Sequence, residues 1–121
     1  MNILFFENNQ LNSKKNYLLQ AVESAANGKR IETVTNFENL SKRLKRLSYT
    51  IAAAVLFASS SETLSGILLL KELLEDIRVI LILPDRMPET ISKGHLLRPR
   101  FLTYADSDFE EVRAVLTKML K

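Results

Sequence analysis

Apolar and polar positions alternate along the chain in blocks that predict strands and helices in turn. Short, mostly apolar runs predict strands, and polar stretches with an apolar residue every three or four positions predict helices. The expected strands cover about 2–6, 30–35, 51–57, 79–83 and 101–104. The expected helices cover about 13–26, 35–47, 59–74, 88–96 and 107–119. This repeated order of strand and helix predicts an α/β fold with a parallel sheet.

The expected strands differ in how apolar they are, and this orders them in the sheet. Ile51–Phe57 and Val79–Leu83 are continuous apolar runs, typical of strands that are buried on both faces. Arg30–Thr35 alternates and suits a half-exposed edge. With right-handed crossovers, these features favour a flavodoxin-like (βα)5 doubly wound sheet of strand order 2-1-3-4-5. We expect one domain over residues 1–121, with ligands or switches at the carboxyl ends of the strands.

Three helix starts resemble capping boxes, in which the first side chain caps the helix and the fourth bonds back. They are Thr35-Asn36-Phe37-Glu38, Ser59-Ser60-Ser61-Glu62 and Ser107-Asp108-Phe109-Glu110. Capping explains the three serines of the second box better than a phosphate-binding nest or a phosphorylated serine.

Composition removes several classes of function. The chain contains no cysteine, which excludes disulfides, thiol nucleophiles, thiolate zinc sites and iron–sulfur clusters. Glycine occurs only at positions 28, 66 and 94, so neither a P-loop nor a dinucleotide fingerprint can form. The segment Glu7–Asn16, where a flavodoxin would hold a flavin phosphate, has no glycine. We therefore expect no cofactor.

The N-terminus lacks the features of a signal peptide, and no apolar run is long enough to span a bilayer, so we expect a cytoplasmic protein without membrane contact.

The order of elements, the length and the opening Ile3-Leu4-Phe5-Phe6-Glu7-Asn8 resemble the receiver domain of bacterial response regulators (CheY-like) across essentially the whole chain. The resemblance implies an acidic pair after the first strand that holds Mg²⁺, and a phospho-acceptor aspartate at the end of the third strand. It further implies a serine or threonine ending the fourth strand and a lysine ending the fifth.

The chain departs from that set at most of its positions. Only Glu7 remains of the acidic pair, beside Asn8, and Ala58, Pro84 and Tyr104 stand at the other three positions. The resemblance is therefore to a degenerate pseudo-receiver that is not an enzyme. It implies a signalling module that acts through protein–protein interaction in a bacterial two-component or related pathway. The alternative is a small flavodoxin-like domain that binds a ligand or metal at the strand-end rim.

Other candidate residues have simpler explanations. Glu7, Asp85 and Asp106 could converge on a divalent cation, but solvated loop and capping acids account for them, and we expect no metal. His95, the single histidine, has no partner motif and is expected at the surface.

One cluster of basic residues stands out in a chain of net charge +3. Lys42, Arg43, Lys45 and Arg46 accompany the apolar face of the second helix. No aromatic residue is interleaved for base stacking. We interpret the cluster as a solvated helix face and do not expect a nucleic-acid partner.

The stretch that ends the fourth helix and enters the fifth strand suggests an interface. Arg98 and Arg100 bracket Pro99 in this stretch, with Tyr104 nearby, and arginine and tyrosine are frequent interface anchors. In receivers, the fourth helix, fifth strand and fifth helix form the output face. We expect a protein partner or self-association there. The alternative is that Pro99 only ends the helix and the arginines are solvated.

Overall fold

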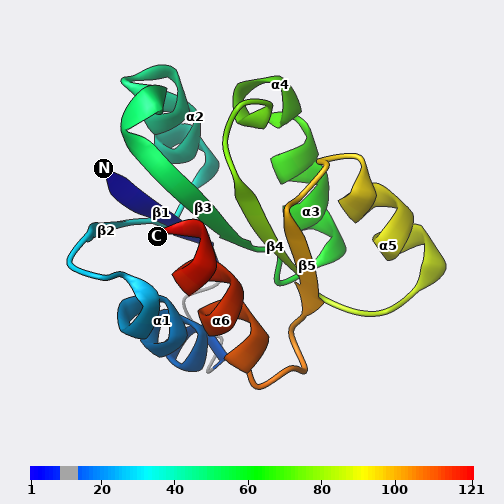
Figure 1. Cartoon of the computed structure of the whole chain (residues 1–121). Helices are drawn as coiled ribbons and strands as arrows, with labels where there is room; N and C mark the ends of the chain where they lie inside the picture. The colour runs from blue at the N-terminus through cyan, green and yellow to red at the C-terminus, as the bar shows by residue number, and fades with distance from the viewer. Residues whose placement is uncertain (9–13) are drawn as a thin grey trace.

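The computed structural model of the chain describes residues 1–8 and 14–121. Its strands form one parallel sheet in the order β2-β1-β3-β4-β5, as the sequence predicts (Figure 1). The strands are β1 (Asn2–Glu7), β2 (Arg30–Val34), β3 (Ile51–Phe57), β4 (Val79–Leu83) and β5 (Phe101–Tyr104). β2 and β5 are the two edges, and the apolar β1, β3 and β4 lie inside.

Helices cover both faces of the sheet because the side chains of the inner strands alternate between the faces. Ile3 and Phe5 pack with α1 and α6, whereas Leu4 and Phe6 pack with the helices of the other face. The helices are α1 (Lys14–Ala25), α2 (Phe37–Lys45), η1 (Ser48–Thr50), α3 (Ser61–Leu68), α4 (Lys71–Leu74), α5 (Pro88–His95) and α6 (Glu110–Met119). Figure 1 shows α1 and α6 side by side, away from α2, α3, α4 and α5. In the described part of the chain, no helix has both the length and the apolar character of a membrane span.

The expected third helix is divided in two. α3 ends with a tight turn in which the Leu70 N–H donates to the Ile67 carbonyl at 2.9 Å, and α4 follows. The turn leaves Leu69 87% exposed and returns Leu74 to the core. The prediction of a single regular helix through 59–74 was therefore wrong.

The helix caps differ from the three predicted boxes. α2 begins after Asn36, whose side chain accepts from the Asn39 N–H, and α3 begins after Ser60, whose side chain accepts from the Thr63 N–H. Each cap thus lies one residue later than predicted. At α6 the capping residue is Phe109, with φ 65° and a fully buried ring. Ser107 Oγ accepts from the Phe109 N–H at 2.9 Å instead of from the Glu110 N–H, so the predicted box does not form there.

Candidate functional site

The strand-end rim of β1 and β3 is closed by core packing and by a hydrogen-bond chain. Glu7 is the last residue of β1 and is fully buried. Asn8 accepts from the Thr63 hydroxyl at 3.1 Å, and the Thr63 hydroxyl lies 3.0 Å from that of Ser60. Asn8 is thereby linked to the start of α3, an interaction that the sequence pattern did not indicate.

Ala58, which follows β3, belongs to the hydrophobic core. Its side chain is fully buried, and its backbone N–H donates to the Ile82 carbonyl at 2.9 Å. Where the receiver resemblance implies a carboxylate nucleophile, this rim therefore presents a buried methyl group.

The rim of β4 and β5 is organised by Arg86, which the sequence analysis did not single out. Its guanidinium carbon lies 4.0 Å from the centroid of the Tyr104 ring, and its Nη2 lies 2.9 Å from Asp106 Oδ1. The hydrogen bond with Asp106 raises the pKa of Arg86. A cation over an aromatic face is attracted by the ring quadrupole. Arg86 therefore joins the loop after β4 to the end of β5.

The receiver-type cation site does not fit this rim. In the described ranges, no three acidic or histidine side chains gather where they could hold a metal ion. Of the weak metal candidates, Glu7 is buried, Asp106 pairs with Arg86, and Asp85 accepts from the Met87 N–H at 3.0 Å. Hydrogen bonds from the Thr90 side chain and the Met87 backbone lower the pKa of Asp85. Asp85 and Asp106 thus make separate contacts, and Glu7 is enclosed in the protein interior.

The residues of the expected interface are spread along β5. Arg98 (φ 50°) and Arg100 are exposed and precede the strand, where the Arg100 N–H donates to the Val79 carbonyl at 2.8 Å. Tyr104 is half-buried at the opposite end of β5. His95 is exposed at the end of α5, as predicted.

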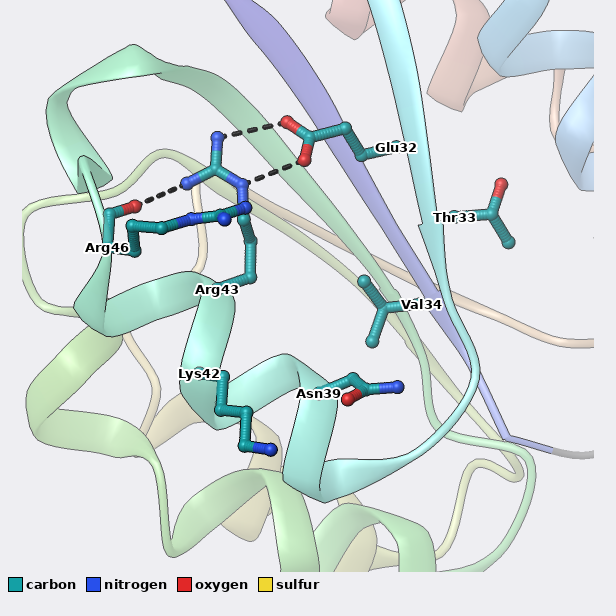
Figure 2. Close-up of a pocket in the computed structure, with 7 residues that line it drawn as sticks. All are labelled: Glu32, Thr33, Val34, Asn39, Lys42, Arg43 and Arg46. Carbon is teal, nitrogen blue, oxygen red and sulfur yellow. Dashed lines mark hydrogen bonds and ion pairs between the residues drawn. The ribbon is translucent and has the colours of Figure 1, made fainter.

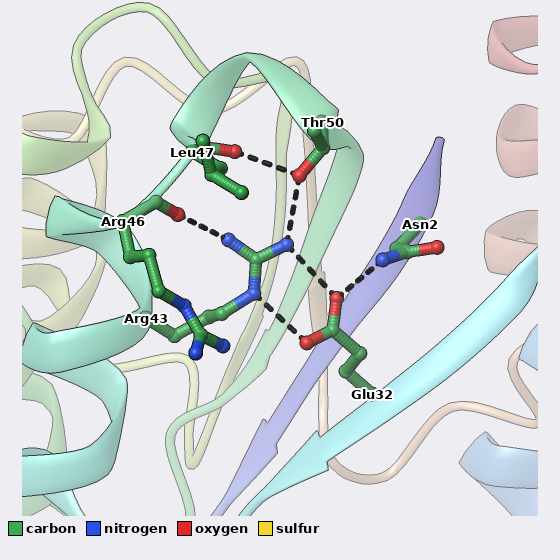
Figure 3. A network of polar contacts seen from close by, with 6 residues as sticks. All are labelled: Asn2, Glu32, Arg43, Arg46, Leu47 and Thr50. Carbon is green, nitrogen blue, oxygen red and sulfur yellow. Dashed lines mark hydrogen bonds and ion pairs between the residues drawn. The ribbon is translucent and has the colours of Figure 1, made fainter.

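At the other edge of the sheet, an ion pair connects α2 to β2. Arg43 is only 8% exposed, and its Nε and Nη2 donate to the two carboxylate oxygens of Glu32 at 2.8 and 2.9 Å (Figure 3). Asn2 donates to the same carboxylate at 2.7 Å. The hydrogen bond from Arg43 is the largest cause of a lowered pKa at Glu32, and Arg43 and Arg30 lower it further by charge, against the opposing effect of burial.

The remaining contacts of Arg43 hold the end of α2 in place. Nη1 donates to the Arg46 carbonyl at 2.6 Å and Nη2 donates to the Thr50 hydroxyl at 2.9 Å. The interpretation of the whole basic cluster as solvated was therefore wrong for Arg43. Its position, three residues after Leu40 and one before Leu44, places it on the apolar side of the helix. That spacing was the signal available in the sequence.

A hollow of about 530 Å³ lies beside this ion pair (Figure 2). It is lined by Glu32, Thr33, Val34, Asn39, Lys42, Arg43 and Arg46. A second hollow, of about 420 Å³, is lined by Asn2, Arg30, Glu32, Arg43, Arg46, Leu47 and Thr50. We call the two together the β2–α2 groove, because they share Glu32, Arg43 and Arg46.

Comparison with solved structures places the fold among receiver domains. The signal receiver domain of the response regulator NarL from Mycobacterium tuberculosis superposes with a TM-score of 0.63 at 13% identity, covering 98% of this chain and 95% of that domain. The response regulator RPA3017 of red light signaling in R. palustris gives a TM-score of 0.63 at 13% identity, covering 95% of this chain and 91% of that chain. The flavodoxin-like receiver fold is thus shared over nearly the full chain.

The same fold also occurs inside a larger enzyme. The lysine decarboxylase LdcF of Francisella novicida matches with a TM-score of 0.61 at 18% identity, over 98% of this chain. The chain spans 17% of the length of that enzyme. No family model and no curated protein sequence matches the chain. At these identities the likeness concerns the fold alone, so function has to be argued from the residues.

Proposed function

We propose that residues 1–121 form a pseudo-receiver, a non-enzymatic cytoplasmic signalling module that binds other proteins and accepts no phosphoryl group. The main support is Ala58, whose buried methyl group stands at the end of β3. Transfer of a phosphoryl group to a receiver needs a carboxylate nucleophile there. It also needs hard oxygen ligands for Mg²⁺ and a cation for the phosphoryl oxygens.

The polar groups of the rim already have other contacts. Asn8 is hydrogen-bonded to Thr63, and the Arg86 cation is shared between Asp106 and Tyr104. Rearrangement to hold a phosphoryl group would break these contacts without supplying a nucleophile. This supports a role in binding.

The output face of the module would be held in one arrangement. Pro84 has no hydroxyl that could follow a phosphoryl group, and a ligand shifts an equilibrium only through differential contacts with the two states. Arg86 and Asp106 also join the loops after β4 and β5. We propose that a signalling partner, or a second copy of the chain, reads the surface of α5, β5 and α6 constitutively, with Arg98, Arg100 and Tyr104 as anchors.

Incubation with acetyl phosphate and Mg²⁺ tests the proposal directly. The intact mass of the protein should stay unchanged, while a receiver domain with its acceptor aspartate, treated in parallel, gains one phosphoryl group. A phosphoryl adduct mapped to a strand-end residue would overturn the proposal.

A further inference from the structure

The β2–α2 groove runs along an open strand edge. β2 pairs with β1 on one side and is the outermost strand of the sheet. Arg30, Glu32, Thr33 and Val34 of this strand all line the groove. In Figure 2, Glu32 and Val34 point toward α2 whereas the Thr33 side chain points away, so Thr33 borders the groove with its main chain. An extended peptide could therefore reach the backbone of β2.

Strand edges are commonly protected by proline, by bulges or by inward-pointing charges. β2 contains no proline, and its pairing with β1 is regular from Arg30 to Val34. Its inward-pointing carboxylate, Glu32, is held by Arg43 and Asn2. The charge that could repel an incoming acidic strand is thereby neutralised.

The opposite wall of the groove carries two exposed cations, Lys42 and Arg46. Lys42 lies in the last turn of α2, and Arg46 is the residue that caps the end of the helix. Lys42 pairs with Glu38 at 3.1 Å, but both side chains are more than two-thirds exposed, at 71% and 77%, so the pair contributes little. Within the ranges that the structure describes, no carboxylate forms an ion pair with the Arg46 side chain.

The backbone of Arg46 is fixed although its side chain is exposed. Its N–H donates to the Arg43 carbonyl at 3.2 Å, and its carbonyl accepts from Arg43 Nη1 at 2.6 Å. The ion pair with Glu32 holds Arg43 in turn. The Arg46 cation therefore projects from a rigid support, which lowers the entropic cost of binding an anion.

We propose that the β2–α2 groove binds an acidic, extended segment of a partner protein, which adds alongside β2 and places its carboxylates against Lys42 and Arg46. Backbone hydrogen bonds to an edge strand supply affinity in this mode, and side-chain pockets supply specificity. A nucleic acid fits less well, because the described lining contains no aromatic residue for stacking bases. The groove lies at the opposite edge of the sheet from the output face, so it goes beyond the proposed function and adds a second binding surface.

A titration of the ¹⁵N-labelled full chain with an acetylated, amidated heptapeptide of alternating valine and glutamate tests this inference. Alternation places every second side chain on the α2 side of an added strand. Amide shifts should change at 30–34 and 42–46, and a peptide with lysine in place of glutamate should leave them unchanged. Binding should weaken as salt is raised.

A pair of neighbouring variants provides the matched control. Arg46→Gln removes a charge inside the groove, and Lys45→Gln removes one from an adjacent exposed residue that does not line it. We expect Arg46→Gln to raise the Kd up to about fivefold, the effect of losing one well-formed exposed ion pair. Lys45→Gln should change the Kd less than about twofold. Unchanged β2 amides in the titration, or equal weakening by both variants when their melting temperatures match the wild type, would overturn the inference.

Discussion

Arg43 and Glu32 face each other through two parallel hydrogen bonds, Nε to Oε1 at 2.8 Å and Nη2 to Oε2 at 2.9 Å. This bidentate geometry is among the strongest that a guanidinium and a carboxylate can adopt. It joins the edge strand β2 to α2, the helix that follows it in the chain.

Arg43→Met should lower the free energy of unfolding by about 2–4 kcal/mol, because it leaves a partly desolvated carboxylate and two oxygen acceptors without their donor. Urea denaturation followed by circular dichroism measures the change. Lys42→Met on the same helix is the control and should shift stability by less than about 0.5 kcal/mol. Glu32→Leu combined with Arg43→Met should recover much of the loss, since replacing both partners removes the unpaired charge. Equal stability of Arg43→Met and Lys42→Met would show that the ion pair is not structural.

The same pair should contribute to stability in a pH-dependent way. The pKa of Glu32 in the folded protein lies below the ordinary value of 4.5, chiefly because of its hydrogen bond with Arg43. At pH values above that ordinary pKa, the ionised carboxylate therefore stabilises the folded protein. This contribution is lost as the pH falls through the pKa of the folded state. Wild type should be more stable than Glu32→Gln near neutral pH, and the two should converge in acid. Urea midpoints of both proteins, measured from neutral to acidic pH, check the prediction. A difference between the two midpoints that stays constant with pH would contradict it.

The output-face proposal predicts that Arg98→Ala with Arg100→Ala weakens self-association or capture of a partner. Both side chains are exposed, so the melting temperature should stay nearly constant. Sedimentation velocity and pull-down from the native host measure the effect. Lys45→Ala with Lys71→Ala, which removes two exposed charges elsewhere, is the control. If the arginine double variant behaves as wild type in both measurements, this face is not the interface.

Arg86→Met should make the loops after β4 and β5 more mobile, with little loss of stability. The Arg86–Asp106 pair is exposed and the contact with Tyr104 is a cation–π interaction, so the free energy of unfolding should change little. Amide resonances of 105–107 should broaden or double if Arg86 holds these loops in one arrangement. NMR relaxation dispersion detects the exchange, and Lys93→Met is the control on α5. Sharp, single resonances in Arg86→Met would show that other contacts hold the rim.

The periodicity of the sequence was sufficient to predict the strand order and most of the core. Leu18, Val22, Leu64, Ile67 and Leu116 are all buried as their spacing predicts. Such patterns work because the alternation of strand side chains and the turn of a helix are local properties of the backbone. The sequence alone also led to the prediction that Ala58 stands where the receiver resemblance implies an aspartate, because that prediction needs only residue identity at the end of a strand.

The tertiary structure decided which polar residues hold separate elements of the fold together. Glu32 and Arg43 are separated by 11 positions and lie on different elements, and a buried guanidinium is tolerated only where the fold brings a carboxylate opposite it. Arg86 over Tyr104 likewise depends on how two loops meet. A Cβ at Gly66 would collide with the Phe37 ring, which packs against Phe6. These contacts join segments distant in sequence, and no local periodicity encodes the distance between them.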